Sequence, residues 1–370
     1  MPFQDWMIFT LLAFVLPAVS SAQHPKEPDK VVKIGLLIPD NKSLAAEYGA
    51  ELAVQKANEK GGFNGLPFRL VVRSMEGPWG TGSKEAVNLI FEDNVWAIMG
   101  SHDGRNAHLV EQAATKARIV FLSAWTSDPT LSQAFVPWYF SCVPNDLQQA
   151  DALINEIYFE RKINRIAIVS DNGYDSGLAL KSFLKKAAMA GMEDPLKFFY
   201  DNNDQNFRDL TNKLNKADIN CIIFLGRPSP LFKIIGQMRL EKMSQPMYCS
   251  LGALDENQLS SEVLRNYENV VFVSSGNWSG HNGLSFNEWF REKYGRLPGA
   301  VAAYAFDGMN IIIEAIRKAG TDRDKIRESI SGIKFEGVTG SIRFDSKGNR
   351  LGTPILMKIK NGTPVDVERE

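Results

Sequence analysis

Residues 31–39, VVKIGLLIP, and residues 46–62, AEYGAELAVQKANEKGG, form the stretch that decides the fold class of this chain. The first segment is a nearly continuous apolar run, rich in β-branched residues and ended by a proline, which is typical of a strand buried in a parallel sheet. In the second segment, residues from Tyr48 to Ala57 recur at helical spacing, and Gly61 begins the glycine pair that ends the helix. A strand followed by a helix is the repeating unit of an α/β fold.

The same alternation continues along most of the chain. Further strands are predicted at 68–74, 95–101, 118–125, 165–171, 196–201, 219–226 and 245–250, and the segment 270–278 is expected to leave the second half. Further helices are predicted at 83–94, 104–117, 147–162, 177–191, 207–217, 231–242, 285–295 and 302–320, before a C-terminal run of short strands. Two βαβ series are therefore expected, one before and one after about Asp146, each forming a mostly parallel sheet.

Three Gly- and Pro-bearing segments separate the two series, and each predicts a crossing of the chain between two lobes. The length of 370 residues suits two compact α/β lobes. We expect an α/β fold of two doubly wound parallel-sheet lobes joined by a three-segment hinge, which confines motion to a few backbone rotations. The expected boundaries are 31–141 plus 277–338 for lobe 1 and 142–276 plus 339–370 for lobe 2.

Composition and motifs exclude several classes of function. The formal net charge is −1, so the chain has no basic field for nucleic acid or an anionic membrane. The four histidines are scattered, which predicts no metal site. GxSxG and HExxH motifs are absent, and no GxGxxG follows the first strand, so we expect neither an enzyme nor a cofactor.

The N-terminus has the pattern of a signal peptide, predicted over residues 1–22. Residues 7–19, MIFTLLAFVLPAV, are apolar, and small residues at 20–22 suit cleavage. The run is too short for a bilayer, which needs about 20 apolar residues. An uncleaved anchor is the alternative.

The three cysteines, Cys142, Cys221 and Cys249, show no CxxC spacing. The absence of this spacing argues against structural zinc and against thioredoxin-like chemistry. Three cysteines can form at most one disulfide. Cys221, within NCIIFLG, is expected to be buried in a strand.

Five segments resemble, in order, the type 1 periplasmic binding proteins, in particular the leucine/isoleucine/valine-binding family of ABC importers. They are VKIGLLIP with AAEYGAELAVQKANEKGGFNG, AIMGSHDGRNAHLVEQAATKARIVFLSAWTSDPTL, RIAIVSDNGYDSGLALKSFLKKA, YAFDGMNIIIEAI and GVTGSIRFDSKGN. The resemblance covers nearly all of residues 31–360.

The resemblance implies a ligand cleft between the lobes, where the carboxyl ends of the strands meet. It further implies a monomeric periplasmic protein that closes on a small polar ligand, an amino acid or related carboxylate, for an ABC permease. The alternative is a ligand-sensing subunit that signals to a membrane receptor.

Carried over by position, the resemblance places first-lobe ligand contacts at Tyr48, Asp103, Arg105, Trp125 and Ser127. Asp103 and Arg105 belong to the loop HDGRN, where the family usually has serines that hold the ligand carboxylate. Arg105 is the alternative anchor, since guanidinium binds carboxylate in a bidentate manner. Packing for Tyr48 and Trp125 and a solvated surface position for Arg105 are the competing interpretations.

In the second lobe, the resemblance places Tyr174 and Arg227 in the cleft, and a solvated Arg227 is the alternative. The acidic residue that usually binds the ligand ammonium group aligns with Leu251. Asp255 or Glu256 is a shifted substitute, although an acid at a helix N-terminus is an equally sensible role. Asp307 is interpreted as structural.

Overall fold

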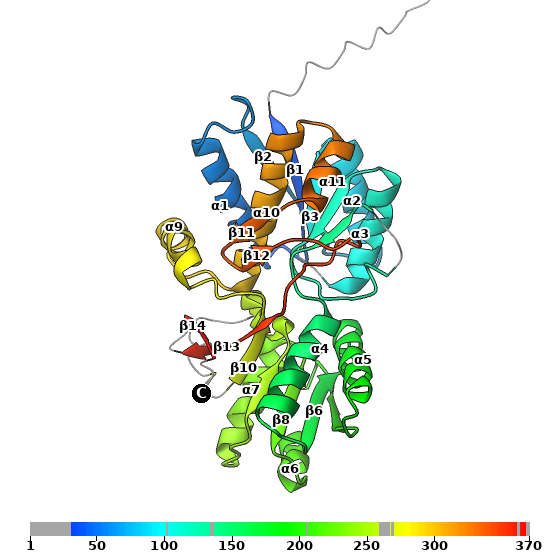
Figure 1. Ribbon diagram of the computed structural model, residues 1–370, viewed down its shortest axis with the longest axis vertical. Coiled ribbons are helices and arrows are strands. Elements are labelled where there is room, and N and C mark those ends of the chain that lie inside the picture. The colour runs from blue at the N-terminus through cyan, green and yellow to red at the C-terminus, as the bar shows by residue number, and fades with distance from the viewer. Residues whose placement is uncertain are drawn as a thin grey trace, which may run out of the picture. The chain divides into compact units, whose positions relative to one another are not determined.

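The computed structural model describes residues 31–100, 103–133, 137–204, 206–258, 267, 270–360 and 363–367 (Figure 1). The chain divides into two compact units, Met1–Lys30 and Val31–Glu370, and all described residues belong to the second. The predicted signal peptide and His102 of the predicted ligand loop lie outside the described residues. Within the described part, no helix is both long enough and apolar enough to cross a membrane.

The first sheet is entirely parallel and has the strand order β2-β1-β3-β4-β5. Its strands are β1 (Val32–Ile38), β2 (Phe68–Ser74), β3 (Ala97–Gly100), β4 (Val120–Ser123) and β5 (Tyr139–Ser141). The helices around it are α1 (Ala45–Glu59), α2 (Thr81–Phe91), α3 (Gly104–Lys116), α10 (Ala300–Ala319) and α11 (Arg323–Ser331).

Helices cover both faces of this sheet because its strands are apolar on both sides. Ile34 and Leu36 belong to the same core cluster as α1 and α10. Leu37, which points to the opposite face, belongs with Ile98 and Phe121 to the cluster formed with α2 and α3. The strand period of two residues thus distributes one apolar run between two helical layers.

The second sheet has the order β14-β13-β10-β9-β8-β6-β7 and is parallel from β10 to β7. Its parallel strands are β6 (Ile166–Asp171), β7 (Leu196–Tyr200), β8 (Cys221–Leu225), β9 (Met247–Cys249) and β10 (Val270–Ser274). Two strands, β13 (Ile355–Lys360) and β14 (Thr363–Asp366), extend the sheet antiparallel beyond β10. The predicted α/β class with two mostly parallel sheets is confirmed.

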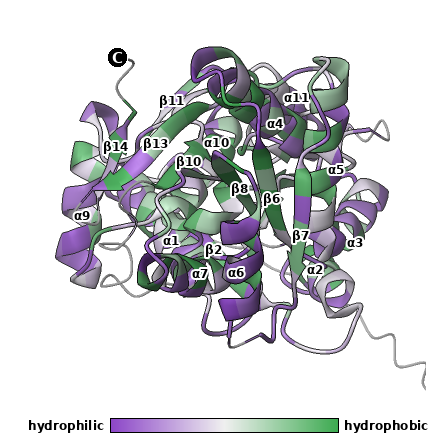
Figure 2. Ribbon diagram, turned by 90° about the horizontal axis from the view of Figure 1, so that it is seen from below, coloured by the Kyte–Doolittle hydropathy of each residue, from purple (hydrophilic) through white to green (hydrophobic). Residues whose placement is uncertain are grey.

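The helices of the second sheet follow its strands as the alternation predicts. They are α4 (Asp146–Ile154), its π-helical continuation at Asn155–Glu160, α5 (Tyr174–Met189), α6 (Arg208–Lys216) and α7 (Pro228–Leu240). Figure 2 shows the hydrophobic strands β6 and β8 and the hydrophilic helix α6. The remaining elements are α9 (Leu284–Tyr294), β11 (Phe335–Gly337), β12 (Gly340–Ile342) and 3₁₀ turns at Leu251–Leu254, Glu256–Gln258 and His281–Gly283.

Two elements differ from the prediction because their sequence signals are weak. β5 has three residues between Pro137 and Pro144, which is too short for a recognisable strand pattern. α11 buries only Ile326 and Ile330, four residues apart, so its apolar stripe covers a single turn.

All three cysteines are free and buried, and Cys221 lies in β8 as predicted. Burial raises the pKa of the Cys142 and Cys221 thiols to about 12. Burial likewise raises the pKa of Cys249 well above its ordinary value. None of these thiols is therefore reactive in the folded chain.

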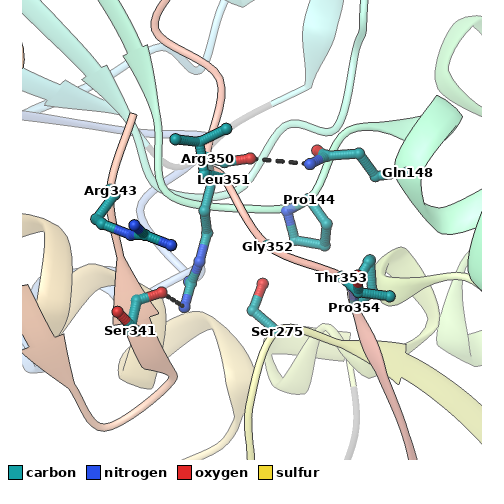
Figure 3. A pocket seen from close by; sticks show the side chains of 10 residues that line it. All are labelled: Pro144, Gln148, Ser275, Ser341, Arg343, Arg350, Leu351, Gly352, Thr353 and Pro354. Atoms are coloured by element: carbon teal, nitrogen blue, oxygen red, sulfur yellow. Dashed lines mark hydrogen bonds between the residues drawn. The ribbon is translucent and has the colours of Figure 1, made fainter. Parts of the chain in front are cut away.

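Three segments connect elements of the first sheet with elements of the second: β5 to α4, β10 to α9, and β12 to β13. They meet around a cavity of about 180 Å³, which Pro144, Ser275 and Arg350 help to line. Figure 3 shows Gln148 pointing to the backbone of Arg350, whose carbonyl accepts a 2.8 Å hydrogen bond from Gln148 Nε2. We call these segments the three connections.

The guanidinium of Arg350 ties two of the connections together. Its Nη1 donates to the carbonyl of Cys142 at 2.7 Å and to Thr339 Oγ1 at 3.0 Å. Its Nη2 donates to the carbonyl of Ser341 at 3.1 Å (Figure 3). The same nitrogen donates to the carbonyl of Thr339 at 2.7 Å. Asp307 of α10 completes this network, since its carboxylate accepts from the backbone and hydroxyl of Thr339, which confirms the structural interpretation.

We predict that Arg350→Met lowers the free energy of unfolding by about 3–5 kcal/mol, because several buried acceptors lose their donor at about 1–3 kcal/mol each. Arg343→Met is the matched control, since Arg343 lines the same cavity but is exposed. The control should stay within about 0.5 kcal/mol of the wild type. Urea unfolding of both variants measures the difference, and equal effects would contradict the role given to Arg350.

Candidate functional site

One pocket lies where the carboxyl ends of parallel strands from both sheets meet. Its cavity volume is about 230 Å³, and we call it the intersheet pocket. Five of the seven predicted ligand residues line it: Asp103, Trp125, Ser127, Tyr174 and Arg227. This edge is where open α/β sheets bind ligands.

The first-sheet residues of the pocket follow β3 and β4. Asp103 is the N-cap of α3, and its Oδ1 accepts the backbone N–H of Asn106 at 2.9 Å. Trp125 is half-buried and packs edge-on against Tyr304, with ring centroids 6.2 Å apart. Ser127 donates its hydroxyl proton to Asp146 Oδ1 at 2.7 Å.

The second-sheet residues of the pocket begin helices. Tyr174 is the first residue of α5, which starts three residues earlier than predicted, directly after β6. Arg227 is the N-cap residue of α7, and Pro228 then occupies the first helical position, where no backbone N–H is needed. Helix N-termini thus face the pocket from this side.

Tyr48 and Arg105, the other two predicted residues, do not line the intersheet pocket. Tyr48 stacks on Tyr294 with ring centroids 4.3 Å apart and lines a different cavity. Arg105 is exposed, and its guanidinium lies 5.3 Å from the ring centroid of Tyr174. The structure thus separates these two residues from the five others.

Besides the bond from Ser127 to Asp146, two further hydrogen bonds connect the two sides of the pocket. Tyr174 donates its hydroxyl proton to Asp128 Oδ2 at 3.1 Å. The backbone N–H of Gly104 donates to Asp175 Oδ1 at 3.0 Å. Both bonds join elements that follow different sheets, so they hold the two sides together.

Asp128 is buried beside His108, and the two form an ion pair. His108 Nε2 lies 3.2 Å from Asp128 Oδ2 and 2.9 Å from Thr130 Oγ1. The hydrogen bond to Asp128 and a second one to Glu111 raise the pKa of His108 to about 9, so the imidazole is charged at neutral pH. Burial alone would raise the pKa of Asp128, but its bonds to His108 and Thr130 hold it below the ordinary value.

Sequence reasoning did not select four further carboxylates of the pocket, Asp40, Asp146, Asp171 and Asp175. Asp146 and Asp171 are 4% and 3% exposed. Burial raises the pKa of Asp175 to about 6, against the opposing bond from Gly104 N–H and with the charge of Asp103 adding to the rise. The motif DNGYDSG at 171–177 places two of them beside Tyr174, which is the signal available in the sequence.

The segment after β9 contains Leu251, the position that the family resemblance aligned with an ammonium-binding acidic residue. Leu251 is buried and donates its backbone N–H to Gln149 Oε1 at 2.8 Å. Asp255 lines the intersheet pocket. Glu256 takes the alternative role of a helix N-terminal acid, because its two oxygens accept the N–H groups of Val301 and Ala302 at 2.8 Å each.

Asn257, the next residue, caps a second helix. Its Oδ1 accepts the backbone N–H of Ala45, the first residue of α1, at 2.9 Å. The segment after a second-sheet strand therefore caps α10 and α1, two helices of the first sheet.

The pocket has no group of ligands suited to a metal ion: among the described ranges, no three His, Cys, Asp or Glu side chains are placed to hold one. Its chemistry is that of carboxylates, hydroxyls, aromatic rings and one guanidinium. Such a site binds a polar organic molecule by hydrogen bonds and charge.

A model of the periplasmic binding protein family matches residues 31–363. The chain is 24% identical over 338 residues to Leu/Ile/Val-binding protein homolog 2 of Brucella abortus, covering 89% of this chain and 90% of that protein. It is 28% identical over 392 residues to glutamate receptor 3.7 of Arabidopsis thaliana. That match covers 93% of this chain but 41% of the receptor, so the chain spans less than half of that relative.

Solved structures show the same fold. The branched-chain amino acid transporter substrate-binding protein LivJ of Streptococcus pneumoniae, in complex with isoleucine, superposes with a TM-score of 0.80 at 22% identity, covering 90% of this chain and 97% of that one. A solute-binding protein of R. palustris in complex with benzoate superposes with a TM-score of 0.78 at 15% identity, covering 91% and 95%.

The buried cap at Glu256 predicts a dependence of stability on pH. Burial raises the pKa of Glu256 to about 7, although the N–H groups of Ala302 and Val301 oppose the rise. The folded state then binds a proton more tightly than the unfolded state, whose glutamates titrate near about 4.3. The free energy of unfolding should therefore fall as pH rises through this window, by at most about 1.4 kcal/mol per pH unit from this group.

Glu256→Gln isolates this contribution, because glutamine keeps an accepting oxygen and does not titrate. We expect the variant to gain stability relative to the wild type as pH rises from about 4.5 to about 7. Urea unfolding at several pH values measures it, with Glu288→Gln on the exposed face of α9 as the control. A constant difference between variant and wild type would show that Glu256 does not titrate as stated.

Proposed function

The chain belongs to the periplasmic binding protein family, whose members bind solutes and are not enzymes, and we propose that it captures a small polar solute in the intersheet pocket for an ABC importer. The observation that carries the proposal is the convergence of Asp103, Trp125, Ser127, Tyr174 and Arg227 on one cavity. In this proposal the protein is exported to the periplasm and acts as a monomer.

The relatives support an amine-bearing solute as the starting class. The Brucella abortus relative is named as a homologue of a Leu/Ile/Val-binding protein. The cavity of about 230 Å³ lies below the range of about 300–1,000 Å³ usual for drug-sized ligands, which suits a molecule of amino-acid size.

Capture is proposed to proceed by rotation about the three connections. With the pocket open, the bonds Tyr174–Asp128 and Gly104–Asp175 are broken and both sides are hydrated. Closure re-forms these bonds around the solute and expels water, which strengthens each hydrogen bond to it. Because several connections run between the two sheets, the opening motion is restricted to a rotation about them, as in a hinge.

A ligand-sensing subunit is the second candidate, and the similarity to the plant glutamate receptor favours it. Deletion of the gene separates the two candidates. An importer subunit predicts loss of solute uptake, whereas a sensor predicts normal uptake and loss of the cellular response to the solute.

The solute-binding role is tested by a thermal-shift screen of the purified protein against amino acids, their amines and small amides. At a hundredfold excess over its Kd, a solute that binds the folded state stabilises it by about 2.7 kcal/mol. We predict that Trp125→Ala weakens binding of that solute at least about tenfold, since the ring forms part of the pocket wall.

Trp79→Ala is the matched control, because Trp79 is 77% exposed and lies outside the pocket. Calorimetry on both variants should show the loss for Trp125→Ala alone. Binding that neither variant changes would place the solute elsewhere and refute the pocket as the site.

A further inference from the structure

The wall of the intersheet pocket has a strong excess of negative charge. Among the described residues that line it, Arg227 is the one basic side chain, and the acidic ones are six aspartates: Asp40, Asp103, Asp146, Asp171, Asp175 and Asp255. Four helix N-termini at the pocket each contribute about half a positive charge, which offsets part of this excess.

Asp146 is the aspartate whose position most directly requires a partner. It is 4% exposed, lines the pocket and accepts one hydrogen bond, on Oδ1 from Ser127. No described residue donates a hydrogen bond to Asp146 Oδ2, and no described basic side chain forms an ion pair with this carboxylate. A buried carboxylate without a counter-ion is costly unless a ligand supplies the charge.

Burial raises the pKa of Asp146 well above its ordinary value, and the charges of Asp175 and Asp128 add to the rise. Asp171 is 3% exposed and accepts the N–H of Gly173 and, weakly, the hydroxyl of Tyr200. These partners are neutral dipoles. They orient the carboxylates without neutralising them.

In the part of the chain that the structure describes, three basic groups near the pocket, His108, Arg105 and Arg227, are already paired or exposed to solvent. His108 is paired with Asp128 and Glu111. Arg105 is exposed over the outer ring face of Tyr174, and Arg227 is exposed, so solvent screens its charge. Neither compensates Asp146.

The aromatic side chains of the pocket wall also suit a cation. Trp125 and Tyr174 line the pocket beside the aspartates, and aromatic faces attract ammonium groups. Because no three ligating side chains among the described residues are placed for a metal, the fitting cation is organic.

We propose that the intersheet pocket selects a solute of net positive charge, with at least one ammonium group bound by Asp146 and a second facing Asp171 or Asp175. This inference rests on the proposed function and narrows it. Two kinds of molecule carry this chemistry, an α,ω-diamine and a basic amino acid, and a neutral branched-chain amino acid does not.

Isothermal titration calorimetry of the purified protein with putrescine, lysine, leucine and glutamate tests the charge. Putrescine or lysine should bind at least about tenfold more tightly than leucine, a difference of about 1.4 kcal/mol. Affinity for the cation should fall as salt rises, because the attraction is electrostatic. Preference for putrescine identifies a diamine, and preference for lysine shows that the α-carboxylate is also bound.

Leucine or glutamate binding as tightly as both cations would overturn the inference while leaving the solute-binding function intact. Failure of both cations to bind would overturn it as well. Failure of the proposed function differs, since then no solute in the wider screen would stabilise the protein.

The variants D146N and D175N locate the cation. Each should weaken binding of the preferred cation at least about tenfold, since each removes a charge-assisted hydrogen bond. D209N, an exposed aspartate of α6 outside the pocket, is the control and should leave Kd unchanged. D146N should also unfold at the same or a higher temperature without ligand, because it removes a buried charge. Wild-type affinity in both pocket variants would overturn the assignment.

Discussion

Arg350 lies 4% exposed among the three connections, and its four hydrogen bonds join the chain at Cys142, Thr339 and Ser341. Its guanidinium also lies 5.9 Å from the ring centroid of Tyr304, whose hydroxyl accepts the N–H of Ser275 in the remaining connection. The guanidinium of Arg350 thus binds backbone carbonyls at Cys142, Thr339 and Ser341, and it contacts the ring whose hydroxyl binds Ser275. Gly348 permits this approach, because its φ of 79° and the neighbouring carbonyl of Tyr139 exclude a side chain. The positions of both pocket walls depend on this arrangement.

The fold was largely predictable because its signals are local. Apolar runs such as Val32–Ile38 and Cys221–Leu225 specify buried strands whatever surrounds them. β5 and α11 were not predictable. β5 has only three residues and α11 has a single apolar turn, so both elements depend on the neighbouring structure more than on their own sequence. The Gly- and Pro-bearing segments indicated where the chain crosses between the sheets, and the family resemblance supplied what local patterns do not, namely the expected place of the ligand cleft.

The candidate site was predictable only in part, because position along a strand does not give the direction of a side chain. Asp103, Trp125, Ser127, Tyr174 and Arg227 follow strand ends and reach the pocket. Tyr48 is on α1 and stacks on Tyr294, and Arg105 is the second residue of α3, two positions beyond the N-cap Asp103. Asp146 and Asp175 were overlooked because each lies in the first turn of a helix, where an acid is favourable for local reasons.

The three buried thiols have a consequence for how such a chain matures. Members of this family work outside the cytoplasm, where oxidising conditions join accessible cysteines into disulfides. Cys142, Cys221 and Cys249 escape this in the folded state, since burial keeps them protonated and out of reach. The unfolded chain has no such protection. In the periplasmic location proposed for it, folding competes with oxidation, and completion of the sheet around Cys221 and Cys249 removes two of the three thiols from that competition.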